Sequence, residues 1–189
     1  MISSDEMTGI QALEPAYPTE TVKMEQPERQ EFEYIRHGTQ SLIANWQVAT
    51  ETLLSPSIAA TRNEADFAAH ITQTVETDAQ AGWIFIVDPL NTHQSKTLVP
   101  WVNRCCNLNL ELGEKGISGI LRSMPSRAAF LSAPSHRIRL VYVPKHSSWL
   151  NQIECWFSIL VRRLLKRGNF TSTQDLRQQI LDFIADFNR

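Results

Sequence analysis

Three acidic side chains, far apart in the sequence, are the residues best suited to chemistry. Asp88 directly follows the apolar run Trp83–Val87 and precedes Pro89, so the sequence predicts a carboxylate at the carboxyl end of a buried strand. Glu154 falls near the edge of the apolar arc of a predicted helix, where a carboxylate is costly unless it is paired, hydrogen-bonded or bound to metal. Asp5 is expected just after another short strand. Carboxylates from two strand ends and one helix could together hold a pair of metal ions.

Each acid also has an ordinary interpretation. A glutamate buried against an arginine would fit the helix, and an aspartate at a strand end is commonly a cap or turn residue. Asn91 and His93 follow Asp88 within one short loop and could orient a metal ion, a water molecule or a phosphate. Spacing alone does not bring the three acids together.

Charge is unevenly distributed along the 189 residues, although the formal net charge is only −2. Residues 1–88 carry 14 acidic and 4 basic side chains, whereas residues 89–189 carry 6 and 14. Residues 115–167 contain ten basic side chains and a single acid. This pattern predicts a nucleic-acid surface, although a solvated basic face would have the same composition. The candidate contacts are Lys145, His146, Arg162, Arg163 and Lys166, with a plain exposed lysine and a turn-stabilising histidine as the alternatives for the first two.

Composition excludes several classes of protein. A chain that is 42% hydrophobic and 20% charged can bury a core, which excludes general disorder. The longest apolar run is Trp83–Val87, far short of the ~20 residues that span a bilayer. Three cysteines, two of them adjacent, make no disulfide framework. We therefore expect a cytoplasmic protein without a membrane partner.

Strands and helices alternate after an opening antiparallel pair, which predicts an α/β fold with a mixed sheet flanked by helices. Trp83–Val87 is expected to be a central strand covered on both faces, and Trp149, Trp156 and Phe157 are expected in the core. The other expected elements are a loop over 14–31, strands 32–36 and 41–48 joined by a turn at 37–39, helices 63–80 and 95–106, strand 140–143, a long helix 149–167 capped by Ser148, and a last helix from 171 or 172 to 186.

Three segments carry a resemblance to a known family. Pro144–Phe157, with the sequence PKHSSWLNQIECWF, resembles the third-acid signature of DDE superfamily endonucleases. These are the catalytic domains of bacterial insertion-sequence transposases related to the mariner group. Asp88–His93 resembles the second-acid motif of this family and Ser4–Thr8 resembles the first. The motifs occur in the family's order, and the resemblance covers nearly the whole chain.

The resemblance implies an RNase H-like fold and a catalytic, metal-binding triad of Asp5, Asp88 and Glu154. It further implies two Mg²⁺ or Mn²⁺ ions, cleavage and strand transfer of DNA at insertion-sequence ends, and a homodimer on DNA at the bacterial nucleoid. The long separation between Asp88 and Glu154 predicts an insertion at 107–137 within a single catalytic domain, 1–189. The helix-turn-helix region that precedes this domain in the family is not found in the sequence, which predicts a separately encoded DNA-binding part.

Two other functions remain open from the sequence. The chain could be an inactive remnant, a DNA-binding or assembly module that keeps the acids, or it could be another RNase H-like nuclease. Metal-dependent cleavage of plasmid DNA distinguishes an enzyme from an inactive module.

Overall fold

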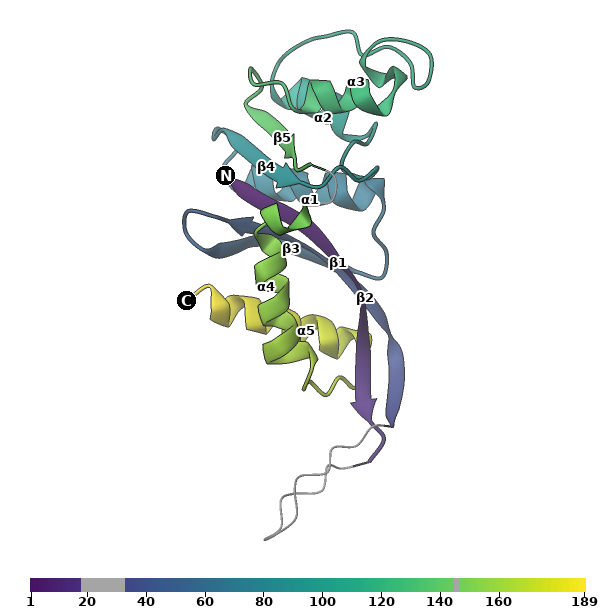
Figure 1. Cartoon of the computed structure of the whole chain (residues 1–189), viewed down its shortest axis with the longest axis vertical. Coiled ribbons are helices and arrows are strands. Elements are labelled where there is room, and N and C mark those ends of the chain that lie inside the picture. The colour runs from purple at the N-terminus through teal and green to yellow at the C-terminus, as the bar shows by residue number, and fades with distance from the viewer. Residues whose placement is uncertain (18–32, 145–146) are drawn as a thin grey trace.

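The structure, a computed structural model, describes residues 1–17, 33–144 and 147–189. One mixed sheet has the strand order β3-β2-β1-β4-β5 (Figure 1). β1 pairs antiparallel with β2, β2 pairs antiparallel with β3, and β1, β4 and β5 run parallel. The mixed sheet predicted from the sequence is therefore confirmed. The strands are β1 (Ile2–Pro15), β2 (Tyr34–Gln47), β3 (Thr52–Ala59), β4 (Trp83–Val87) and β5 (Ile138–Tyr142).

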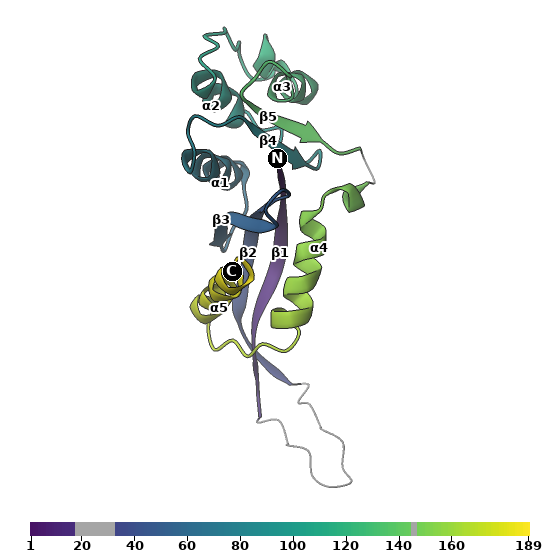
Figure 2. The same cartoon turned by 90° about the vertical axis from the view of Figure 1, so that its left-hand side faces the viewer.

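Helices cover the sheet from both sides, and Figure 2 shows α1 and α4 on opposite sides of β1. One apolar cluster joins α1, α2 and α3 to β4 and β5, and a second joins α4 and α5 to β1 and β2. In the described part of the chain, no helix is long and apolar enough to cross a membrane. The helices are α1 (Glu64–Glu76), α2 (Leu98–Cys105), α3 (Met124–Leu131), α4 (Ile153–Leu160), continued by a π-helical turn (Val161–Leu165), and α5 (Thr173–Phe187).

The first two strands are longer than predicted. β1 continues through Asp5 to Pro15, so the first acid lies within a strand and not after one. β2 is one continuous strand, because the expected turn at His37 and Gly38 is a bulge in its pairing with β1. Gly38 has a φ of 126°, which only glycine adopts readily, and this lets the strand continue past the irregularity. The first two residues of the expected loop at 14–31 belong to β1. Residues 18–32 lie outside the described residues.

Several helix boundaries follow the sequence signals. Asn63 caps α1 by accepting hydrogen bonds from the backbone of Ala65 and Asp66, although the helix ends at Glu76 and not at residue 80. Ser172, one of the two residues expected at the start of the last helix, caps α5 by accepting a hydrogen bond from the backbone of Asp175. α3 was not expected, because Pro125 suggests a helix break, yet this proline occupies the first turn, where its missing N–H costs nothing.

The predicted long helix 149–167 is wrong at its start. A 3-10 turn (Ser148–Leu150) comes first, and α4 begins only after the fully buried Asn151. Trp149 is 73% exposed and does not enter the core, whereas Trp156 and Phe157 are buried as predicted.

The expectation that β4 is covered on both faces is only half correct. Trp83, Phe85 and Val87 are buried by the helices of the α1 side, while Ile84 and Ile86 are only partly buried. The reason is that α4 packs mainly on β1 and β2. The α4-facing side of the sheet at β4 is therefore partly open beside the candidate acids.

Candidate metal and nucleic-acid site

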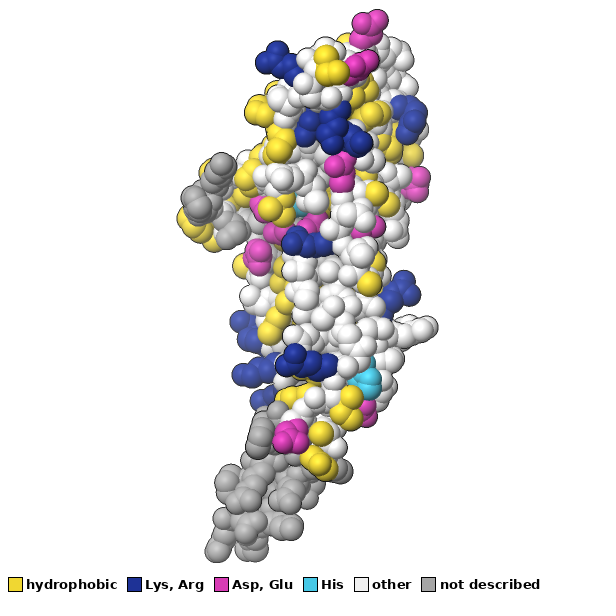
Figure 3. Space-filling view, turned by 90° about the vertical axis from the view of Figure 1, so that its right-hand side faces the viewer, with side chains coloured by type: hydrophobic (Ala, Val, Ile, Leu, Met, Phe, Trp, Pro, Cys, Tyr) yellow, Lys and Arg dark blue, Asp and Glu magenta, His cyan; other side chains and the backbone are white. Residues whose placement is uncertain are grey.

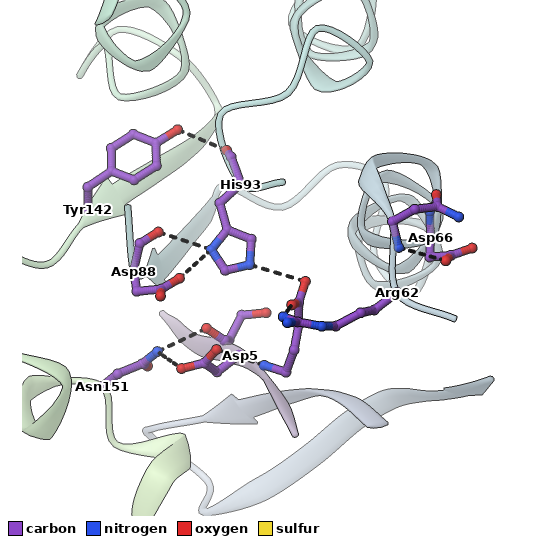
Figure 4. Close-up of polar contacts among 10 residues, drawn as sticks. Asp5, Arg62, Asp66, Asp88, His93, Tyr142 and Asn151 are labelled. Carbon is purple, nitrogen blue, oxygen red and sulfur yellow. Dashed lines mark hydrogen bonds and ion pairs between the residues drawn. The ribbon is translucent and has the colours of Figure 1, made fainter. Parts of the chain in front are cut away.

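Asp5 lies at the centre of the candidate site, on the side of β1 that faces α4 (Figure 4). Its Oδ1 accepts a hydrogen bond from the Glu6 amide at 2.7 Å, and its Oδ2 accepts one from Asn151 Nδ2 at 3.1 Å. The pKa of the Asp5 carboxyl is raised to about 6, mainly by burial. The hydrogen bond from the Glu6 amide and the charge of His93 lower this pKa, and the charges of Asp88 and Glu154 raise it. Within the described part of the chain, Asp5 is thus a buried carboxylate near other carboxylates, and no basic side chain forms a hydrogen bond or an ion pair with it.

Asp88 follows β4, as the sequence predicted, and is held by His93. The Nδ1 atom of His93 lies 2.7 Å from Oδ1 of Asp88 and 3.0 Å from its carbonyl oxygen. The ring of His93 packs on Phe67 with the centroids 4.2 Å apart, and Tyr142 donates to the His93 carbonyl at 3.0 Å. These contacts fix the loop that carries the second acid.

The surroundings of His93 favour its protonated form. Burial lowers its pKa, but hydrogen bonds from the ring to the Asp88 carboxylate, the Glu6 carboxylate and the Asp88 carbonyl outweigh this and raise the pKa to about 9. Its side chain is 0% exposed, so it has no surface to offer a phosphate. His93, expected as a nucleic-acid contact, is buried against Asp88 and Glu6, whereas Asn91 in the same loop is exposed.

Glu6, which was not among the predicted site residues, also contacts His93. It faces the α1 side, where its Oε2 lies 2.7 Å from Arg62 Nη1 and its Oε1 lies 3.5 Å from His93 Nε2. Burial raises the pKa of Glu6, but His93 and Arg62 lower it more, and the net pKa is below its ordinary value. The available signal was the Asp5-Glu6 pair itself, because adjacent residues of a strand face opposite sides of the sheet.

Glu154 lies in the first turn of α4, where its side chain is exposed and not on the buried arc that the helical pattern suggested. Its carboxylate forms no hydrogen bond or ion pair within the described ranges, and its charge contributes to the raised pKa of Asp5. Among the residues described, no three His, Cys, Asp or Glu side chains form a ready-made metal cluster. The donor set nevertheless fits Mg²⁺ chemically, since this ion is held by one or two carboxylates and keeps several waters.

The predicted nucleic-acid contacts include three basic residues near the end of the α4 helix. Arg162, Arg163 and Lys166 are exposed on the π-helical turn and just after it, and none forms an ion pair within residues 1–17, 33–144 and 147–189. Figure 3 shows Asp and Glu side chains at mid-height on one face, with Lys and Arg side chains above and below them. Lys145 and His146 lie outside the described residues.

Comparison with known proteins places this geometry in context. A family model described as DDE superfamily endonuclease matches residues 1–177. No curated protein matches the chain. Among solved structures, the Mos1 mariner paired-end complex with Mn matches with a TM-score of 0.59 and 14% identity, over 99% of this chain and 49% of that one.

Two further Mos1 structures match in the same way. The Mos1 transposase paired-end complex with the left transposon end gives a TM-score of 0.60 at 13% identity, over 99% of this chain and 49% of that chain. The Mos1 strand transfer complex gives 0.59 at 13% identity, over 97% and 46%. These matches confirm the RNase H-like fold, and the chain spans about half the length of the Mos1 chains.

Proposed function

Because this chain belongs to the DDE superfamily endonucleases, we propose that it is the catalytic domain of an insertion-sequence transposase that cleaves and joins DNA strands. The observation that carries the proposal is the environment of Asp5. This carboxylate is buried, its pKa is raised to about 6, and the charges that raise it beyond the effect of burial are those of Asp88 and Glu154. Such a group of carboxylates is stabilised by a divalent cation.

Asp5, Asp88 and Glu154 would hold the ions, with Asp5 between the other two. When bound, two divalent ions lower the pKa of an attacking water or 3′-hydroxyl and stabilise the leaving oxygen of an in-line displacement. The chain's own residues prepare this site. His93 holds the Asp88 carboxylate, Glu6 holds the other side of the His93 ring, and the exposed Glu154 is free to turn toward a bound ion.

The test is cleavage of supercoiled plasmid DNA with Mg²⁺ or Mn²⁺ and with EDTA. We expect metal-dependent nicking that Asp5→Ala, Asp88→Ala and Glu154→Ala each abolish, with unchanged circular dichroism spectra. Binding of DNA without cleavage by the wild type would favour the inactive assembly module. Preferential cleavage of RNA or of an RNA–DNA hybrid would favour another RNase H-like nuclease.

We propose that DNA phosphates contact the exposed Arg162, Arg163 and Lys166, together with Asn91, Lys145 and His146. Each phosphate contact adds roughly 0.9 to the slope of log K against log salt. Reversing the charges of Arg162, Arg163 and Lys166 together should therefore lower this slope by about 3. An unchanged slope would assign this helix surface to solvent or to a protein partner.

The finer features of the system are also proposals. We propose a homodimer on DNA at the bacterial nucleoid, two Mg²⁺ or Mn²⁺ ions per site, an insertion at 107–137, and sequence recognition by a separately encoded DNA-binding part. Metal-held phosphate chemistry reads no base edges, so the 189-residue chain should prefer terminal-repeat DNA over scrambled DNA by less than about a hundredfold, ~2.7 kcal/mol. Competition binding at fixed salt measures the preference, and sedimentation with end DNA measures the stoichiometry.

A further inference from the structure

We infer that Asn151 is a positioning residue of the metal site, because its amide orients the Asp5 carboxylate and fixes the start of α4 to β1. The inference rests on the proposed function and deepens it. It assigns a role to a buried amide that is neither a metal ligand nor a DNA contact.

The side-chain amide of Asn151 forms its hydrogen bonds with three consecutive residues of β1, Ser3, Ser4 and Asp5. The side chain is 0% exposed. Nδ2 donates to the Ser4 carbonyl at 3.0 Å and to Asp5 Oδ2 at 3.1 Å, which uses both of its hydrogens. Oδ1 accepts a hydrogen bond from the hydroxyl of Ser3. With both ends of the amide held, its plane cannot rotate, and the donor that meets Asp5 has a fixed direction (Figure 4).

The same contacts anchor the helix that carries the third acid. The amide of Ile153, the first residue of α4, donates to Ser3 Oγ at 2.9 Å. The first N–H groups of a helix have no partner within it, and Gln152, at the N-cap, provides no side-chain hydrogen bond. The Ser3 hydroxyl on β1 therefore caps the N-terminus of α4. Since Glu154 is the next residue, the bond fixes the backbone of Glu154 relative to Asp5.

Orientation matters here because a carboxylate binds a metal ion through lone pairs of defined direction. One lone-pair direction of Asp5 Oδ2 is taken by Asn151, and one of Oδ1 by the Glu6 amide, so the remaining directions are set before an ion arrives. Loss of such an outer partner of a metal ligand typically costs 10–100-fold in metal affinity or activity.

The chain offers a matched control for a buried asparagine. Asn45 is also 0% exposed, and its Nδ2 donates to Thr74 Oγ1 at 2.6 Å on the α1 side of the sheet, away from Asn151. Asn151→Ala and Asn45→Ala each remove one buried amide and should both lower the melting temperature. Ser3→Ala removes the helix anchor but leaves the Asn151 donor on Asp5.

The experiment titrates Mn²⁺ into the full chain without DNA and follows free Mn²⁺ by electron paramagnetic resonance, at a temperature where all variants are folded. We expect Asn151→Ala to weaken Mn²⁺ binding about 10–100-fold, Ser3→Ala to weaken it less, and Asn45→Ala to leave it within about twofold. Affinity for a DNA duplex in EDTA should be the same for all four proteins, which separates positioning of the metal site from general damage.

The outcomes are distinct. If Asn151→Ala binds Mn²⁺ as well as Asn45→Ala does, the inference is overturned while the proposed function stands. If the wild type binds no Mn²⁺ with or without duplex DNA, the proposed function fails and the inference fails with it. If Asn151→Ala does not fold, Asn151→Ser, which also removes the amide, is titrated in its place: a loss of Mn²⁺ affinity of about tenfold or more supports the inference, and an affinity equal to that of Asn45→Ala overturns it.

Discussion

The two sides of β1 treat adjacent carboxylates in opposite ways. Asp5 faces the α4 side, where an amide and a backbone N–H are its only hydrogen-bond donors within the described chain, and its pKa is raised to about 6. Glu6 faces the α1 side, where His93 and Arg62 neutralise it and its pKa is lowered. Both acids are buried, so burial alone does not explain the difference.

The difference supports the proposal that Asp5, and not Glu6, binds an external cation. On the α1 side, Arg62 and His93 are the positively charged partners of the Glu6 carboxylate. On the α4 side the described residues supply oriented neutral donors to Asp5 and no ion pair. Both positions of the Asp-Glu pair belong to the motif, but their surroundings differ, and this difference supports the proposal that Asp5 and not Glu6 binds metal.

The largest expected effect comes from removing the Asp5 charge. Asp5→Asn keeps the size of the side chain and should reduce metal-dependent cleavage about a thousandfold, since metal stabilisation of a transition state is worth several kcal/mol. Single-turnover cleavage of an end duplex at saturating Mg²⁺ measures this loss. A variant that retains a tenth of the wild-type rate would remove Asp5 from the ligand set.

Glu6→Gln should instead act on folding. It leaves the His93 imidazolium and the Arg62 guanidinium without their shared carboxylate, and breaking a buried pair costs about 3–5 kcal/mol. We expect the lower end, about 3 kcal/mol, because Arg62 is 43% exposed and can turn to water. Urea unfolding at pH 7 measures the loss.

The control for Glu6 is Glu14→Gln. Glu14 also pairs with a histidine, His37 at 2.7 Å, but both side chains are about 30% exposed, as the values of 32% and 27% show. Exposed pairs contribute about 0–1 kcal/mol. Equal losses for the two variants would mean that the α1-side network contributes no more than a surface pair.

The sequence predicted the parts of this site that depend on local pattern. The run Trp83–Val87 followed by Asp88 and Pro89 identified β4 and the second acid correctly, because a buried strand and its end are local features. Asn63 and Ser172 were readable as caps for the same reason.

What the sequence did not predict depends on long-range contacts. Asn151 and Asp5 are 146 positions apart, and no periodicity signals a hydrogen bond between them. Asn151 lies before α4, which begins at Ile153 and not at Trp149. Leu150, which was used to define the buried arc beside Glu154, is therefore not part of the helix. Gly38 was misread because a glycine suited to a turn is equally suited to a bulge in a continuous strand.

A pH series sharpens the comparison at the pair of Asp88 and His93. The pKa of His93 rises from 6.5 to about 9 on folding, so its stabilising contribution is complete below pH 6.5 and is lost as the pH rises through 9. The free energy of unfolding of the wild type should fall by about 2 kcal/mol more than that of His93→Gln between pH 7 and pH 10. His70, also buried, has its pKa lowered to about 3 and stays neutral throughout this range. Parallel curves for the two proteins would contradict a charged His93.

The smallest effect concerns the stability of the metal-free protein at Asp5. Its pKa rises from 3.8 to about 6 on folding, so the folded state holds this proton more tightly than the unfolded state between those values. The contribution of Asp5 to the free energy of unfolding is therefore fully present below pH 3.8 and is lost as the pH rises through 6, the reverse of a carboxylate paired with a cation.

In EDTA, Asp5→Asn should be more stable than the wild type by about 1–2 kcal/mol at pH 7.5 and equal to it near pH 4. Mn²⁺ should reverse the order at pH 7.5, because it binds the folded wild type and stabilises it by mass action. Urea unfolding of both proteins at the two pH values, with and without Mn²⁺, measures all of these differences. If Asp5→Asn were less stable than the wild type in EDTA at pH 7.5, the Asp5 charge would be compensated by the protein itself, and the two sides of β1 would not differ in the way described.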